Sequence, residues 1–146
     1  MNKTIKKSIA IHAPKEKVWE VLLNDEYTRQ WYAEFMEGSH AETDWSVGSK
    51  ALFTDNTGSG IIGKIVENKK AELLSIEHLG AVENGKEVYD SEMAKAVKGS
   101  MEVYKLSESN GMSNLTISVD MGEEHFDFMS VARDRALQKI KSFSEA

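Results

Sequence analysis

Residues 123–144 carry the longest helical hydrophobic pattern in the chain, and this pattern limits the possible folds more than any other feature. At about 100° per residue, the apolar side chains fall within an arc of roughly 140°, and charged or amide side chains lie opposite. Such a helix must bury one face against another layer of structure. The residues of this arc are Phe126, Met129, Ala132, Ala136, Leu137, Ile140 and Phe143.

Much of the chain before this helix alternates apolar and polar residues with a period of two, which is typical of half-buried strands. Pro14 suits the first turn of a helix, and Asn24 can cap a second short helix over 25–32. We expect a loop with one helical turn over 80–98. Strands are expected at 4–11, 34–40, 50–54, 61–67, 73–79, 100–106 and 115–121. The predicted fold class is α+β, with two short helices after the first strand.

Size, charge and composition exclude several classes of protein. The chain has 146 residues, about the size of one domain, so we expect a single domain over 1–146. The absence of cysteine excludes disulfides and thiol catalysis, and the net charge of −6 argues against a nucleic-acid partner. No apolar run approaches the roughly 20 residues of a membrane span, and no signal peptide is evident. We therefore expect a cytoplasmic protein with no membrane span.

Several short motifs, taken together in their order and spacing, resemble a known superfamily. They are Ile9-x-Ile11-x-Ala13-Pro14-x-x-x-Val18-Trp19-x-x-Leu22, Trp31, Asp44-Trp45-x-x-Gly48-Ser49-Lys50, Asp55-x-x-Gly58-Ser59-Gly60, Glu77-His78-Leu79-Gly80 and Ala136-Leu137-x-x-Ile140-Lys141. The chain resembles the SRPBCC, or START-like, helix-grip superfamily, and within it the bacterial relatives of the activator of the ninety-kilodalton heat-shock protein's ATPase. The resemblance implies a curved antiparallel sheet of about six to seven strands wrapped around the carboxy-terminal helix, with a cavity between them.

The resemblance also indicates which residues would line that cavity. Side chains of the strands and of the long helix would form its walls, and Trp31 and Tyr32 would border its opening. Three polar residues, His78, His125 and Arg133, lie on otherwise apolar faces and join the set. The candidate ligand-binding residues are Trp31, Tyr32, Ile61, Ile65, Leu74, Ile76, His78, Tyr104, Leu115, Ile117, His125, Met129, Arg133 and Ala136.

Arg133 is the most unusual of these positions, because it falls inside the apolar arc of the long helix. A charge there must be paired or must reach solvent, since an unpaired buried ion is very costly. One interpretation is a structural ion pair with a sheet glutamate such as Glu102 or Glu77. The other is an anchor for the anionic head of a ligand. His78 and His125 are either satisfied interior or rim histidines or polar groups that line the cavity.

Other motifs do not indicate a site. Residues 58–63 match G-x-G-x-x-G, but β-branched residues follow where a dinucleotide site needs a helix, so we predict hairpin glycines. The four histidines are too dispersed along the chain to indicate zinc, and we predict neither a metal nor a cofactor. Asp120 and Glu124 form a carboxylate pair that we expect to cap the final helix.

The sequence contains no catalytic constellation of nucleophile, base and orienting acid, so it gives no positive reason to predict an enzyme. We expect a non-enzymatic domain that binds a small hydrophobic or amphipathic molecule between the sheet and the long helix. Two alternatives remain open. One is a co-chaperone-like regulator of a chaperone ATPase, which the family resemblance implies. The other is a cyclase or hydrolase that uses His78 or His125 in the same cavity.

Overall fold

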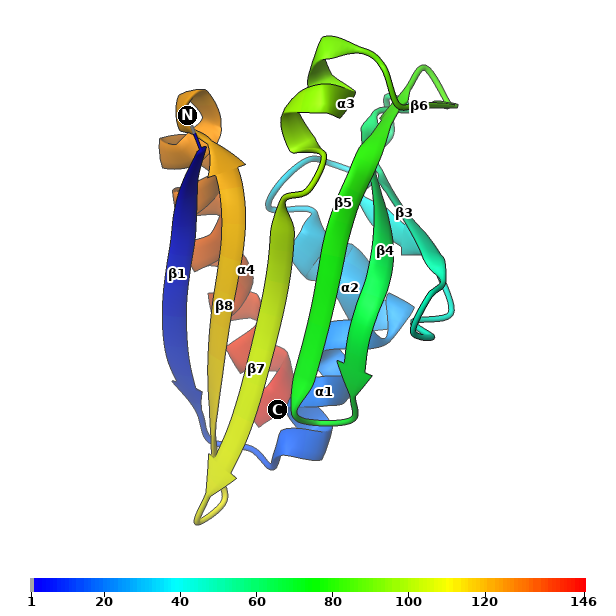
Figure 1. Ribbon diagram of the computed structural model, residues 1–146. Coiled ribbons are helices and arrows are strands. Elements are labelled where there is room, and N and C mark those ends of the chain that lie inside the picture. The colour runs from blue at the N-terminus through cyan, green and yellow to red at the C-terminus, as the bar shows by residue number, and fades with distance from the viewer. Residues whose placement is uncertain (1) are drawn as a thin grey trace.

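A computed structural model of the chain describes residues 2–146 and consists of a curved antiparallel sheet with its three main helices on one face (Figure 1). The elements follow in the order β1 (Asn2–Ile11), α1 (Lys15–Leu23), α2 (Asp25–Tyr32), β2 (His40–Glu42), β3 (Lys50–Thr54), β4 (Gly60–Lys69), β5 (Leu73–Glu83), β6 (Lys86–Val88), α3 (Glu92–Val97), β7 (Met101–Ser109), β8 (Met112–Gly122), a 3-10 turn (Glu123–His125) and α4 (Phe126–Glu145).

The sheet has eight strands, and its order is β1-β8-β7-β5-β4-β3-β2, with β6 paired separately to β5. All of these pairs are antiparallel. The first strand pairs with β8 along its whole length, from Asn2 opposite Gly122 to Ile11 opposite Ser113. Two register shifts interrupt the pairing of β4 with β5, between Ile62 and Gly63 and between Ile65 and Glu67. Such bulges increase the local twist and help the sheet to curve.

Asn24 separates the two short helices and fixes the turn between them. Its backbone N–H bonds the Glu20 carbonyl and ends α1, while its side chain accepts a hydrogen bond from the Glu26 N–H at 3.0 Å and caps α2. Pro14 is the N-cap residue of α1, one position before the first turn in which the sequence placed it. The turn brings both helices against α4, so three helices cover the concave face of the sheet.

The long helix α4 packs along the sheet with the face that its periodicity predicted. Ala132, Ala136, Leu137 and Ile140 are buried, and the helix contacts β1, α1 and α2. Trp31 of α2 is buried beside this face, and its indole N–H bonds the Val21 carbonyl at 3.1 Å. The predicted α+β class and the curved sheet around a carboxy-terminal helix are both confirmed.

Two parts of the predicted element order were wrong. The strand expected over 34–40 is absent up to residue 39: the chain turns after α2, with Phe35 N–H bonded to the Tyr32 carbonyl at 2.9 Å, and pairing begins only at His40, the first residue of β2. The turn buries Phe35 partly against the core instead of extending it. The segment 80–98, expected as a loop with one helical turn, does contain a short helix, α3, which Ser91 caps by accepting from Ala94 N–H, but it also contains the end of β5 and the short strand β6, which were not predicted.

The sheet opens at one end, because β5 extends beyond the point where β7 begins. The regular pairing of these strands stops at Glu77 opposite Met101, and the last links join His78 N–H to the Ser100 carbonyl and Gly99 N–H to the His78 carbonyl, both at 2.8 Å. Beyond them β5 pairs with β6, and α3 contacts both β5 and β8 (Figure 1). A helix therefore occupies the place where another strand segment would continue the sheet.

Candidate functional site

The opened end of the sheet encloses a cavity of about 460 Å³. Its walls come from the end of α2 and the turn after it, the β3–β4 hairpin, helix α3, the end of β8, the 3-10 turn and the first turns of α4. His78, Ser100 and Glu102 line the side where β5 and β7 diverge. The other lining residues are Tyr32, Phe35, Met36, Ser39, Phe53, Thr54, Asp55, Ser59, Gly60, Ile61, Met93, Ala96, Val97, Val119, Asp120, Met121, Gly122, Glu124, His125, Phe128, Met129 and Arg133.

Six of the candidate ligand-binding residues lie on this wall: Tyr32, Ile61, His78, His125, Met129 and Arg133. The remaining eight belong instead to the packed core, where helices α1 and α2 fill the other half of the concave face. These eight residues are Trp31, Ile65, Leu74, Ile76, Tyr104, Leu115, Ile117 and Ala136.

Four polar side chains meet at the inner end of the cavity and form one network. The Arg133 guanidinium donates from Nη1 to the Tyr104 hydroxyl at 2.8 Å, and its Nη2 lies 3.2 Å from Glu102 Oε2. The Tyr104 hydroxyl donates to the same carboxylate oxygen. His78 Nε2 lies 3.3 Å from the other oxygen, Oε1. The network joins α4 to β5 and β7, and Glu102 is the partner of Arg133 that one interpretation of the sequence named.

The guanidinium also stacks on an aromatic ring. Its central carbon lies 4.5 Å from the centroid of Phe35, which fits a cation–π contact. Arg133 Nε has neither a hydrogen-bond partner nor accessible surface. Nη1 and Nη2 of Arg133 thus both contact protein oxygen atoms, and Nε is buried.

Burial and charge act in opposite directions on this network. Burial alone would raise the pKa of Glu102, but the Arg133 charge and the hydrogen bonds from His78 and Tyr104 hold that pKa well below its usual value. Burial, reinforced by the Glu102 charge, raises the pKa of Tyr104 well above its usual value. Burial would lower the pKa of Arg133, yet its anionic and phenolic partners raise it. The stable state is an ionised Arg133–Glu102 pair with a neutral Tyr104.

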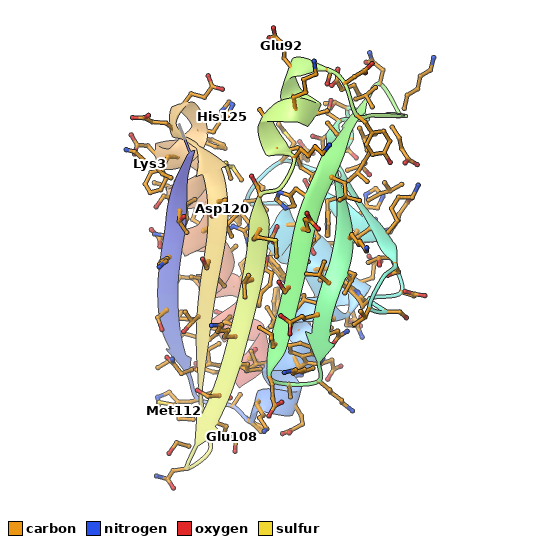
Figure 2. The ribbon with its side chains drawn as sticks, in the orientation of Figure 1. Lys3, Glu92, Glu108, Met112, Asp120 and His125 are labelled. Carbon is orange, nitrogen blue, oxygen red and sulfur yellow. The ribbon has the colours of Figure 1, made fainter. Side chains whose placement is uncertain are left out.

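The polar residues at the cavity rim behave differently. His125 is exposed and lies 3.4 Å from Glu124, so the structure puts it at the rim and not inside the apolar interface of α4. Asp120 accepts hydrogen bonds from the Thr4 hydroxyl and from Met101 N–H, both at 3.0 Å. The prediction that Asp120 caps the final helix is therefore wrong. Asp120 and His125 both lie toward the end of the sheet that carries α3, opposite Glu108 and Met112 (Figure 2).

Sequence reasoning missed the large apolar side chains at the mouth. Met36, Met93 and Phe128 are 51%, 48% and 66% exposed, respectively, yet all three line the cavity. Phe128 carried a usable signal, because it lies outside the apolar arc of its helix, and a large aromatic residue on a polar face suggests a partner. Met36 and Met93 lie in a turn and in a six-residue helix, which are too short to show a hydrophobic period.

Other predicted or excluded sites can be checked directly. The G-x-G-x-x-G motif runs from the turn at Gly58 into β4, so it is part of a hairpin as predicted. Within residues 2–146, no group of three His, Asp or Glu side chains could hold a metal ion. None of the helices in the described part of the chain is both long and apolar enough to cross a membrane.

Solved structures with similar folds cover nearly the whole chain. A protein from Mesorhizobium loti aligns with a TM-score of 0.74 at 13% identity, covering 97% of this chain and 96% of that one. The Aha1 dimer from Colwellia psychrerythraea gives 0.71 at 17% identity, with coverage of 98% and 96%. CalU16 from Micromonospora echinospora gives 0.68 at 17% identity, with coverage of 99% and 77%. These likenesses establish the helix-grip fold.

A comparison with curated proteins gave no match. The family described as activator of Hsp90 ATPase homolog 1-like protein matches residues 12–124, from the residue after β1 to the turn before α4. That range includes most of the sheet and the three shorter helices, and it contains Glu102, Tyr104 and His78 of the polar network. The chain belongs to the activator of Hsp90 ATPase homolog 1-like family, in the helix-grip fold.

Proposed function

We propose that the chain binds a small hydrophobic or amphipathic molecule in the cavity between the sheet and α4. One observation carries this proposal: a cavity of about 460 Å³ has mainly apolar and aromatic walls and a polar network at its inner end. This volume falls within the range of about 300–1,000 Å³ that is typical of small-molecule sites, where a few polar groups orient an apolar ligand. Membership of a family built on this fold supports the proposal.

The position of the cavity supports a binding site more than a packing defect. A void left by poor packing would lie within the core, where most native voids are smaller than a water molecule. This cavity lies where β5 and β7 diverge, and its wall is formed by parts of the chain that are far apart in sequence. The residues below it are tightly buried, among them Ile76, Tyr104 and Ile117.

Native mass spectrometry of protein purified without detergent tests the proposal, combined with thermal shifts against a panel of apolar and amphipathic compounds. Met129→Trp places a large side chain in the cavity, and Val131→Trp places the same side chain on an exposed position of the same helix. We expect ligand-induced stabilisation to be lost in the first variant and retained in the second. No bound mass and no stabilisation across the panel would overturn the proposal.

The family description supports a second candidate, an interaction with a chaperone ATPase. The exposed apolar residues Met36, Met93 and Phe128 offer a surface for such a contact. We expect a chaperone contact to change ATP turnover when the purified protein is added at saturating concentration. Unchanged turnover by the bacterial ninety-kilodalton chaperone would exclude this candidate.

A further inference from the structure

Three of the buried residues that line the cavity carry a polar side-chain atom with no hydrogen bond to another described residue and with some accessible surface: His78 at Nδ1, and Tyr32 and Ser100 at their hydroxyls. They differ from Arg133 Nε and Ser144 Oγ, the two side-chain atoms of residues 2–146 that have neither a partner nor accessible surface. The three wall atoms therefore keep some open surface although their residues are buried. Because their residues line the cavity, these three atoms are the candidates for hydrogen bonds to a bound molecule.

The polar network determines what His78 offers to a ligand. The Glu102 carboxylate is held in its ionised form and can only accept hydrogen bonds, so the proton of a neutral His78 ring belongs on Nε2, 3.3 Å away. Nδ1 then carries a free lone pair. The ring therefore presents an acceptor to the cavity, whereas the hydroxyls of Tyr32 and Ser100 can either donate or accept.

The charges around the cavity disfavour an anion. Arg133 is the one arginine or lysine among the lining residues, and Glu102 neutralises it through a direct ion pair. The lining also includes the carboxylates of Asp55, Asp120 and Glu124. Thr57 and Ser59 satisfy Asp55 with hydrogen bonds that hold its pKa below the usual value against burial, so its charge remains. An entering carboxylate would meet excess negative charge and no free cation.

We propose that the cavity selects an uncharged ligand with an apolar body and a hydroxyl or primary amide head. The head donates a hydrogen bond to His78 Nδ1 and accepts one from the hydroxyl of Tyr32 or Ser100, and carboxylates are rejected. This inference rests on the proposed function and gives its ligand a chemical class. It assigns Arg133 to the scaffold of the cavity and not to an anion anchor.

Three naphthalenes of similar size test the inference by isothermal titration at pH 7.5. They are 2-naphthol, which can donate and accept, 2-methoxynaphthalene, which can only accept, and 2-naphthoate, an anion. We expect 2-naphthol to bind about 3- to 10-fold more tightly than 2-methoxynaphthalene, the usual effect of one hydrogen bond. We expect 2-naphthoate to bind at least about tenfold more weakly than 2-naphthol, because its carboxylate loses its hydration and finds no free cationic partner in the cavity.

Substitutions at His78 assign the preference to one atom. His78→Leu removes the acceptor and should bring the affinities for 2-naphthol and 2-methoxynaphthalene together. His78→Asn retains an acceptor oxygen near the position of Nδ1 and should keep part of the preference. His12→Leu makes the same change at an exposed histidine outside the cavity and should leave the preference intact.

The outcomes separate the inference from the proposed function. Equal or tighter binding of 2-naphthoate would overturn the inference, as would an unchanged 2-naphthol preference in His78→Leu, while the cavity would remain a binding site. Absence of binding by all three compounds would count against the proposed function itself. If His78→Leu fails to fold, ¹⁵N NMR of the wild-type imidazoles decides: 2-naphthol must shift the His78 Nδ1 resonance, and an unmoved signal contradicts the proposed hydrogen bond.

Discussion

Glu102 on β7 and Arg133 on α4 form an ion pair whose side chains are only 15% and 7% exposed, respectively. Removing one member of such a pair leaves the other charge buried without compensation, which costs more than the pair itself contributes. The pair therefore stabilises one particular packing of α4 on the sheet, because any rotation of α4 would leave both charges buried without a partner. Four predictions follow from this geometry and from the hairpin beside the cavity.

Arg133→Met should destabilise the fold by about 3–5 kcal/mol, since it leaves the buried Glu102 carboxylate without its counter-charge while keeping a side chain of similar length. Urea unfolding followed by tryptophan fluorescence measures the loss. Arg135→Met makes the same change on an exposed position of the same helix and should cost no more than about 0.5 kcal/mol. Equal stabilities of the two variants would show that the buried pair does not hold the helix.

Tyr104→Phe deletes one hydroxyl that accepts from Arg133 and donates to Glu102. We expect a loss of about 1–3 kcal/mol, because Arg133 Nη1 is left without its protein partner in a largely buried network. Tyr89→Phe removes a hydroxyl at a position that is 50% exposed and serves as the control. Thermal melts of both variants distinguish them, and a Tyr104→Phe protein as stable as wild type would contradict the assigned network.

Glu102 makes stability depend on pH in a defined direction. Its folded-state pKa is depressed by Arg133, His78 and Tyr104 despite burial, so the unfolded chain takes up a proton first as the pH falls. The contribution is complete above about pH 5, just above the unfolded pKa of about 4.3, and is lost as the pH falls from there toward the lower folded pKa.

The matched measurement compares urea unfolding of wild type and Glu102→Gln between pH 7 and pH 3. The stability difference should be about 3–5 kcal/mol at pH 7 and should shrink below about pH 5. Glu67→Gln, at an exposed strand position, should follow the wild-type curve throughout. A difference between wild type and Glu102→Gln that does not change with pH would mean that Glu102 is not ionised in the folded protein.

Gly60→Ala should distort the β3–β4 hairpin at the edge of the cavity. A Cβ atom at Gly60 would lie 1.8 Å from the Phe53 carbonyl oxygen and 2.8 Å from Thr54 Cα, and both of these are backbone atoms. We expect a loss of about 1–3 kcal/mol, as for other overpacked sites. Gly122→Ala, where a Cβ meets nothing within 4 Å, is the control for melting temperature. A neutral Gly60→Ala would show that the hairpin can move away from the added methyl.

The sequence predicted the fold well because its strongest signals are local. The period of α4, the helix start at Pro14 and the cap at Asn24 each depend on residues only a few positions apart. A sheet glutamate such as Glu102 or Glu77 was predicted as one possible partner of Arg133 for a different reason: a buried charge needs a counter-charge on the facing layer. Both kinds of inference need no knowledge of strand register.

The cavity residues could not be predicted in the same way, because they depend on where strands end and how they pair. A one-residue shift exchanges the two faces of a strand, and β4 and β5 contain two such shifts. The late start of β7 and the short helix α3 decide which end of the sheet stays open, and a six-residue helix leaves no periodic signal. Ile65, Leu74 and Ile117 were therefore expected on the cavity wall but lie in the core.

The pairing of β1 with β8 has a consequence for how the protein is made. Within residues 2–146, β1 pairs with β8 alone, and β8 is the last strand in chain order. During synthesis from the amino terminus, β1 must therefore wait, unpaired, while the other strands are produced. Closing so long a loop costs chain entropy before the contacts between β1 and β8 form, and this slows folding. The folding rate should therefore be set by the arrival of β8 and not by the rapid formation of the helices.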